Sequence, residues 1–258
     1  MELFDSHCHL DDEKFDQDRE EIISHIFSSG VTKLISAGYS LEGSKKAIEL
    51  TSKYPQIYTV SGISPNDILE NVEKIEEQIN EIEKYAKNEK VVGIGEIGLD
   101  YYWNKENKDL QQFAFIKQIE LANSLNLPIV IHTRDAVADT IEILKKHPVN
   151  KKGVFHCCPL NPELIKEALK LGFYISFAGP ITFKNSKNAD EVINLVPDDR
   201  ILIETDSPYL SPEPNRGKRN DSSNVKYIAQ KIANVKGYAV EKVAKMTYDN
   251  ACRIFEIK

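Results

Sequence analysis

The sequence predicts an α/β fold, and the arrangement that fits it best is a single-domain (β/α)8 TIM-like barrel over residues 1–258. Eight apolar runs of strand length alternate with amphipathic stretches of helix length, which is the order of parallel β-α-β units. Through the eighth run the spacing averages about 28 residues per unit, close to what such a barrel needs. The runs are rich in β-branched residues and almost continuously apolar, as expected of strands buried on both faces.

The predicted elements follow one another without a linker or a sequence repeat. The apolar runs are 2–5, 31–37, 57–61, 91–95, 128–131, 153–156, 173–177 and 200–204. The helical stretches are 17–28, 41–53, 72–86, 107–125, 135–147, 161–171, 188–196 and a last section over 222–257. In the third of these, Val72, Ile75 and Ile79 recur at three- and four-residue spacing and so share one helix face. A doubly wound open sheet is the alternative, but it usually has a glycine-rich phosphate turn where this first strand runs into His-Cys-His.

Composition excludes several classes of protein. The chain carries 33 Lys and Arg against 40 Asp and Glu, a formal net charge of −7, which argues against binding polyanions through net charge. With 41% hydrophobic residues it is too apolar for intrinsic disorder, and no uncharged apolar run approaches the roughly 18 residues of a membrane span. The four Cys form no CxxC pair, and the N-terminus lacks the basic start and apolar core of a signal peptide. We expect a monomer of the reducing cytoplasm that contacts no membrane and needs no organic cofactor.

Rare polar residues occur at or just past the predicted strand ends, where a closed barrel carries its active site. They are His7 and His9 after the first strand, Glu96 after the fourth, His132 after the fifth, His156 after the sixth and Asp206 after the eighth. His7 and His9 are two residues apart, so on a strand they share a face and Cys8 points the other way. Imidazoles suit zinc and similar metals, whereas carboxylates suit harder ions.

Each of these residues also has a simpler interpretation when it is taken alone. The first two His could be polar neighbours near a chain end, the other two could be core His bonded to backbone, and Asp206 could be a turn residue before Pro208. Glu96 could be a strand-end acid that faces solvent, since burying it unpaired is costly. Together, however, four His and two acids at five strand ends indicate a site for two divalent ions, with Glu96 as the natural bridge. Two such ions can polarise a phosphoryl or carbonyl oxygen and generate hydroxide near neutral pH.

Basic and aromatic residues near the same strand ends could contact a substrate. Arg134 lies just past the fifth strand, where it could hold a phosphate, or it could be a surface residue that starts the next helix. The loop 214–220 could follow a nucleic-acid backbone, or it could simply be solvated. Its bases are Arg216, Lys218 and Arg219. The aromatic run 101–103 could stack on bases or pack at the barrel mouth.

Taken in order, these motifs resemble those of the TatD family of metal-dependent deoxyribonucleases, within the amidohydrolase-like barrels. The matching segments are FDSHCHL (4–10), GIGEIGLDYYW (93–103), PIVIHTRDA (128–136), VFHC (154–157), ILIETDSPYL (201–210) and PNRGKRN (214–220). The resemblance implies a Mg-, Mn- or Zn-dependent hydrolase, typically a 3′-to-5′ exonuclease on single-stranded DNA or RNA. By position it implies two metal sites, one formed by His7, His9, Glu96 and Asp206 and the other by Glu96, His132 and His156.

We therefore predict a deoxyribonuclease with two divalent metal ions (Mg, Mn or Zn) whose partner is DNA, either single-stranded or at 3′ ends. In this prediction Asp206 ligates a metal and accepts the proton of the attacking water, while Arg134 and the loop 215–219 position phosphate. In the segment GISPN, Ser64 and Asn66 stand where the family usually has His. The first of those His usually lies near the substrate, so we place Ser64 and Asn66 at the substrate-binding side and expect an altered rate or substrate preference.

Two other functions remain open from the sequence. One is a small-molecule amidohydrolase, lactonase or phosphotriesterase on the same barrel. Many relatives of that kind use a carboxylated Lys at the fourth-strand position, where this chain has Glu96. The other is a metal- or DNA-binding protein without catalytic activity, which the changes at Ser64 and Asn66 would permit.

Overall fold

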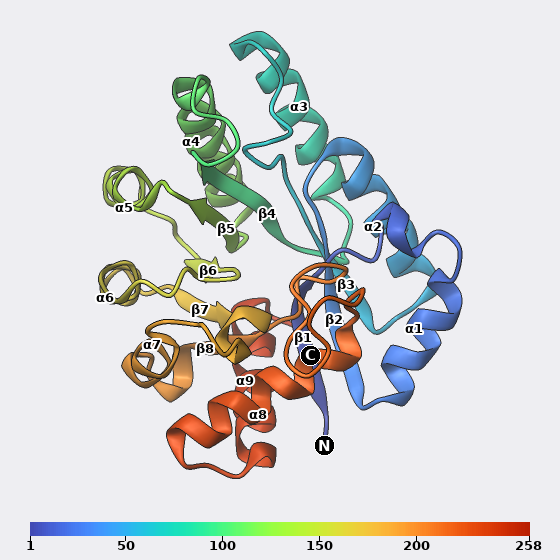
Figure 1. Cartoon of the computed structure of the whole chain (residues 1–258). Coiled ribbons are helices and arrows are strands. Elements are labelled where there is room, and N and C mark those ends of the chain that lie inside the picture. Colours follow the sequence, from blue (N-terminus) through green and yellow to red (C-terminus); the bar gives the residue numbers. More distant parts are fainter.

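A computed structural model describes residues 1–258, and in it a ring of strands is surrounded by helices (Figure 1). The strands are β1 (Leu3–Cys8), β2 (Val31–Gly38), β3 (Ile57–Ser61), β4 (Val91–Asp100), β5 (Ile129–Arg134), β6 (Gly153–Phe155), β7 (Tyr174–Phe177) and β8 (Ile201–Ile203). The helices are α1 (Arg19–Ser28), α2 (Leu41–Lys53), α3 (Val72–Tyr85), α4 (Lys108–Leu125), α5 (Val137–Lys146), α6 (Pro162–Lys170), α7 (Ala189–Leu195), α8 (Val225–Lys236) and α9 (Val240–Ile254).

The strands form one eight-stranded parallel sheet in sequence order, β1 to β8. Beyond the end of β8 the chain returns to β1 and nearly closes the ring. The Asp206 N–H donates to the His7 carbonyl at 2.9 Å, and the His9 N–H donates to the Ser207 carbonyl at 2.7 Å. The predicted (β/α)8 barrel is therefore confirmed.

Several element boundaries differ from the prediction: β1 continues to Cys8 and β5 to Arg134, and two further differences affect β4 and the last helical section. The strand predicted over 91–95 continues to Asp100 as β4, because it stays paired with β5 as far as the partners Asp100 and Arg134. The last helical section divides into α8 and α9 at Gly237, whose φ of +68° is the left-handed conformation that ends many helices.

The interior of the barrel is packed, and one end of it is closed. Every strand contributes at least one apolar residue to the inner core, for example Phe4, Val92 and Leu202 near the strand beginnings. The end of α9 and the residues after it, including Phe255 and Ile257, pack against this core. The N-terminal end of the strands is thus covered, which leaves the C-terminal end as the mouth.

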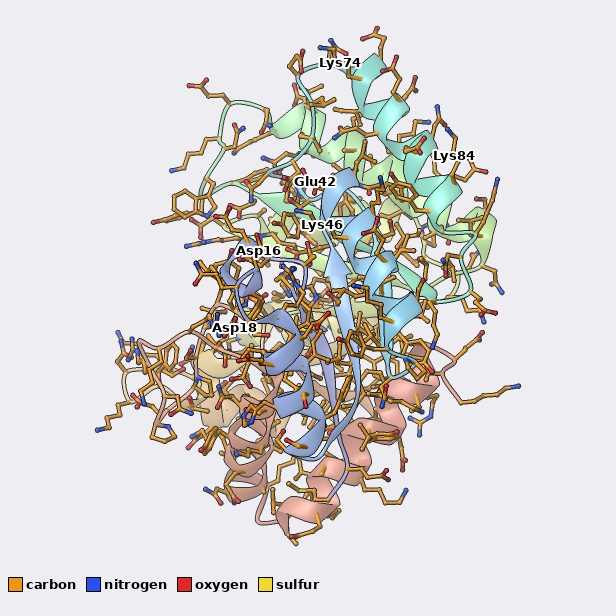
Figure 2. The ribbon with its side chains drawn as sticks, turned by 90° about the vertical axis from the view of Figure 1, so that its right-hand side faces the viewer. Asp16, Asp18, Glu42, Lys46, Lys74 and Lys84 are labelled. Carbon is orange, nitrogen blue, oxygen red and sulfur yellow. The ribbon has the colours of Figure 1, made fainter.

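The outer helices turn charged side chains to solvent. Lys46 pairs with Glu42 at 2.7 Å along α2 (Figure 2). Lys74, in the first turn of α3, pairs with Glu70, which lies just before that helix. Such exposed pairs add little stability and mainly mark the solvated helix faces. None of the helices combines the length and the hydropathy that crossing a lipid bilayer requires.

Candidate metal centre

The first strand delivers two imidazoles to the mouth of the barrel. The pairing of β1 with β2 is irregular between Asp5 and Cys8, and such an irregularity re-aims the end of a strand. His7 and His9 lie on the same side, with their Nε2 atoms 3.3 Å apart. Cys8 is buried in the apolar layer between the strands and the helices. The predicted sharing of one face by the two His is confirmed.

Glu96 lies between two pairs of imidazoles. Its Oε2 is 3.3 Å from His7 Nε2 and 3.8 Å from His9 Nε2. Its Oε1 is 2.9 Å from His132 Nδ1 and 3.2 Å from His156 Nε2. The residue is only 7% exposed, so the interpretation as a solvent-facing acid is wrong. Each carboxylate oxygen therefore serves a different pair of His.

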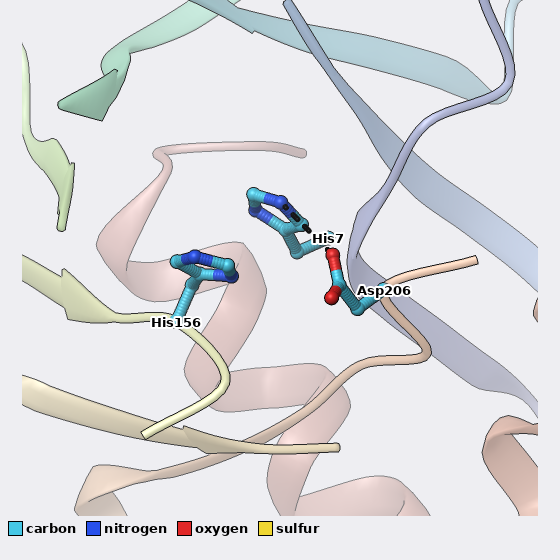
Figure 3. A group of neighbouring side chains, drawn as sticks. All are labelled: His7, His156 and Asp206. Atoms are coloured by element: carbon cyan, nitrogen blue, oxygen red, sulfur yellow. Dashed lines mark ion pairs between the residues drawn. The ribbon is translucent and has the colours of Figure 1, made fainter. Parts of the chain in front are cut away.

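Asp206 joins this cluster from the loop after β8. Its φ of +54° is left-handed, a conformation that Asp tolerates better than most residues. Its Oδ1 lies 3.2 Å from His9 Nε2 and 3.7 Å from His7 Nε2. Figure 3 shows it beside His7, whose ring stacks on that of His156 with the centroids 4.1 Å apart. The structure thus brings all six predicted ligand side chains together.

The outward-facing nitrogens of three imidazoles lie near acceptors, and hydrogen bonds to two of these acceptors fix the orientation of the ring. His9 Nδ1 lies 3.1 Å from the Ala37 carbonyl, and His132 Nε2 lies 3.0 Å from Asp100 Oδ2. His156 Nδ1 lies 3.3 Å from a carboxylate oxygen of Glu204, which is an ion-pair distance without the geometry of a hydrogen bond. Outer acceptors of this kind hold the proton on the far nitrogen and leave the near nitrogen free to bind a metal.

Both carboxylates of the cluster are held as anions. Burial alone would raise the pKa of Glu96, but the neighbouring imidazoles, chiefly those of His156 and His132, hold that pKa well below its usual value. Burial would also raise the pKa of Asp206, and there the His9 imidazole is the main group that lowers it. Two buried anions so close together need positive charge between them.

The donor set fits divalent metal ions. Three triplets of side chains each bring their ligand atoms within 4.8 Å of one another. They are His7, His9 and Glu96; Glu96, His132 and His156; and His7, His156 and Asp206. The first two triplets share only Glu96, as a bridging carboxylate would require. Mixed imidazole and carboxylate ligands are typical of Zn and Mn sites, and carboxylates also suit Mg.

Two residues that the sequence analysis missed support the cluster from outside. Asp100 ends β4 four residues after Glu96 and contacts His132, as described above. Glu204 is fully buried and accepts a 2.6 Å hydrogen bond from the Cys157 N–H as well as facing His156. The sequence feature that could have identified both residues is an acidic side chain within or just after an apolar strand.

The predicted substrate residues are more dispersed. Ser64 Oγ donates to Asp67 at 2.5 Å, and Asn66 Nδ2 donates to Asp100 at 3.3 Å, so both are engaged within the protein. Arg134 is exposed at the end of β5, with its guanidinium 3.9 Å above the Tyr102 ring.

The three bases of the loop 214–220 have different surroundings. Arg219 is held by an ion pair with Asp18, which lies 201 residues away in the sequence. Arg216 lies over the Phe183 ring at 4.1 Å, and Lys218 is exposed beside a hollow at the mouth. The structure therefore leaves Arg216 and Lys218 without an acidic partner.

Comparison with known proteins gives one consistent family. The family model described as "TatD related DNase" matches residues 4–256. The chain is 43% identical over 256 residues to the uncharacterized metal-dependent hydrolase YabD of Bacillus subtilis, with 99% of both chains covered. It is 38% identical over 264 residues to the uncharacterized metal-dependent hydrolase YcfH of Escherichia coli K12, covering 100% of this chain and 97% of that one. The crystal structure of the TatD homolog YJJV from E. coli K12 has the same fold, with a TM-score of 0.92 and 24% identity over 99% of this chain and 98% of that chain.

Proposed function

The chain belongs to the TatD family and is a metal-dependent hydrolase, and we propose that it hydrolyses phosphodiester bonds of DNA, as a monomeric 3′-to-5′ exonuclease acting on single strands or 3′ ends. One observation carries the proposal: the two oxygens of Glu96 face two separate pairs of imidazoles. This is the arrangement expected of a bridging ligand between two divalent ions. The six side chains of the cluster come together within one chain, so the proposed activity requires no residue from a second subunit.

The side chains of the cluster have distinct roles in this proposal. His7, His9, Glu96 and Asp206 would hold one ion, and Glu96, His132 and His156 the other. Bound Mg²⁺, Mn²⁺ or Zn²⁺ would supply Lewis acidity, polarising the phosphoryl oxygen and lowering the pKa of a coordinated water. Asp206 contacts the imidazoles through Oδ1, which leaves its Oδ2 to accept the proton of the attacking water.

Basic side chains around the mouth would position the phosphate. Arg134, Arg216 and Lys218 form no ion pair, so their charges are available to a polyanion, whereas Arg219 is committed to Asp18. Ser64 and Asn66 would act at the substrate side by shaping the mouth, because their polar groups already bond to Asp67 and Asp100.

Replacing Asp206 by Ala tests the proposal. The substrates are end-labelled single- and double-stranded oligonucleotides, digested over time by protein loaded with Mg²⁺ or Mn²⁺. Loss of a general base typically costs about 10²- to 10⁴-fold in rate, and we expect a loss in that range. Asp249→Ala is the matched control, because Asp249 is an exposed acid on α9, the helix that closes the opposite end of the barrel.

Two results would contradict the proposal. Equal, background-level DNA cleavage by wild type and Asp206→Ala would show that the chain is not a nuclease. Hydrolysis of a lactone, an amide or a phosphotriester, without release of nucleotides from DNA, would instead assign it to the small-molecule hydrolases.

A further inference from the structure

The chain after β4 presents two exposed aromatic rings at the mouth of the barrel. Trp103 is 68% exposed and Tyr102 is 48% exposed, among the few large hydrophobic side chains that the fold leaves in solvent. Tyr101, by contrast, is buried, and its hydroxyl donates to Asp139 at 2.7 Å. The run 101–103 therefore contains one packing residue and two rings that are exposed to solvent.

The backbone holds these two rings close to the metal centre. The N–H groups of Tyr102 and Trp103 donate to Asp100 Oδ1 at 3.0 and 3.1 Å. The other oxygen of the same carboxylate meets His132 Nε2 at 3.0 Å. A single buried side chain thus separates the aromatic segment from one of the candidate metal ligands.

An unpaired cation lies against the same rings. The Arg134 guanidinium is 3.9 Å from the Tyr102 ring centre and 5.5 Å from that of Trp103. It forms no ion pair, whereas three other arginines of this chain each pair with an aspartate. In a protein of net charge −7, an exposed Arg without an acidic partner is a local site for an anion.

We propose that Trp103 is a stacking platform for a nucleobase of the substrate strand, and that Arg134 binds the phosphate beside that base. This inference rests on the proposed nuclease function and names the feature of the substrate that the site reads, an unstacked base of a single strand. Arg134 covers one face of Tyr102, so the more exposed Trp103 is the ring available for stacking. An indole face beside a guanidinium suits a base attached to a phosphate, since every base has a π-face and the backbone is anionic.

Because Trp103 is the single Trp of the chain, its fluorescence reports on this site alone. The probe is a phosphorothioate-linked thymidine oligonucleotide, added to metal-loaded wild-type protein so that hydrolysis is slow during the titration. Stacking of a base on indole quenches its emission, and we expect saturable quenching by this oligonucleotide. An abasic strand of the same length and inorganic phosphate are expected to leave the emission nearly unchanged.

Kinetics on ordinary single-stranded DNA give a second measurement. Trp103→Leu keeps an apolar side chain but removes the aromatic face, and we expect it to raise KM about tenfold with a smaller change in kcat. Trp103→Phe should recover part of the loss. Tyr227→Leu, which alters a partly exposed aromatic residue beside Lys226 on α8, is the control and should leave KM unchanged.

The outcomes separate this inference from the proposed function. Cleavage of DNA without quenching, or equal quenching by the abasic strand, would overturn the stacking site while the nuclease assignment stands. Base-dependent quenching without any DNA cleavage would support the stacking site and refute the nuclease assignment. A KM that is the same for Trp103→Leu and wild type would also overturn the stacking site.

Discussion

Replacing Asp100 by Asn is expected to weaken metal binding although Asp100 is not itself one of the six candidate metal ligands. Asp100 is 1% exposed, and its carboxylate meets four polar groups. Oδ1 accepts from the N–H groups of Tyr102 and Trp103, and Oδ2 meets Asn66 Nδ2 at 3.3 Å and His132 Nε2 at 3.0 Å. Burial raises the pKa of Asp100, but His132 and its other partners lower it to about 2, so the group is an anion at neutral pH.

The amide introduced by Asp100→Asn has only one accepting oxygen. If that oxygen keeps the two backbone N–H groups, the new NH₂ faces His132 Nε2, which must then accept. The imidazole proton would move to Nδ1, the nitrogen that lies 2.9 Å from Glu96, and Nδ1 could no longer bind a metal. Loss of such an outer partner typically weakens metal affinity 10- to 100-fold, or about 1.4 to 2.7 kcal/mol.

Titration calorimetry with Mn²⁺ measures this loss, and ¹⁵N NMR of the His132 ring reports its tautomer. We expect one of two binding steps to weaken by that factor, with the proton on Nδ1 in the variant. Asp139→Asn is the control, because Asp139 accepts hydrogen bonds from Tyr101 and Gln112 near the same segment but contacts no candidate ligand. If Asp100→Asn binds Mn²⁺ within twofold of wild type at both steps, the orienting role of Asp100 is refuted.

Two further predictions concern stability. Gly98→Ala should lower the free energy of unfolding, measured by urea denaturation, by more than about 3 kcal/mol, because φ at Gly98 is +139° and a Cβ there would lie 2.0 Å from the His132 carbonyl oxygen. Gly237→Ala is the control: φ there is +68° and the surrounding space is open, so the loss should be only about 1 kcal/mol. Equal losses for the two variants would contradict the steric argument. Burial raises the pKa of Asp198, but the contacts with Lys236, Tyr238 and Lys242 lower it by more than burial raises it. The pKa of Asp198 therefore lies below its usual value of 3.8. The stabilisation by ionised Asp198 is therefore present above pH 4 and is lost as the pH falls below that value. The difference in the free energy of unfolding between wild type and Asp198→Asn should be largest near neutral pH and should shrink in acid. A difference that grows in acid would contradict this sign.

Most of the fold and the inner cluster could be predicted because both follow from local patterns. Strand-length apolar runs gave the eight strands, and their order gave the barrel. His7, His9 and Asp206 were found because the ends of parallel strands meet at one mouth, so residues remote in sequence converge there. The partner of Arg219 could not be found in this way, because Asp18 lies in another loop and no local pattern links the two.

The end of β4 explains why Asp100 was missed and how the site is built. The apolar run stops at Gly95, so sequence periodicity ends the strand there, although the chain shifts register between Ile94 and Ile97 and then stays paired with β5 as far as Asp100. Gly95 and Gly98 permit this because they carry no side chain: a Cβ at Gly95 would lie 2.6 Å from that of Val130, and Gly98 is tighter still. Glycine weakens the hydrophobic signal of a strand at the same positions where it allows close strand packing. The resulting extension of β4 carries Glu96 into the interior of the mouth and brings Asp100 up to His132. Gly95 and Gly98 thus interrupt the apolar pattern from which the strand was predicted, and the same two glycines allow the packing that places Glu96 and Asp100.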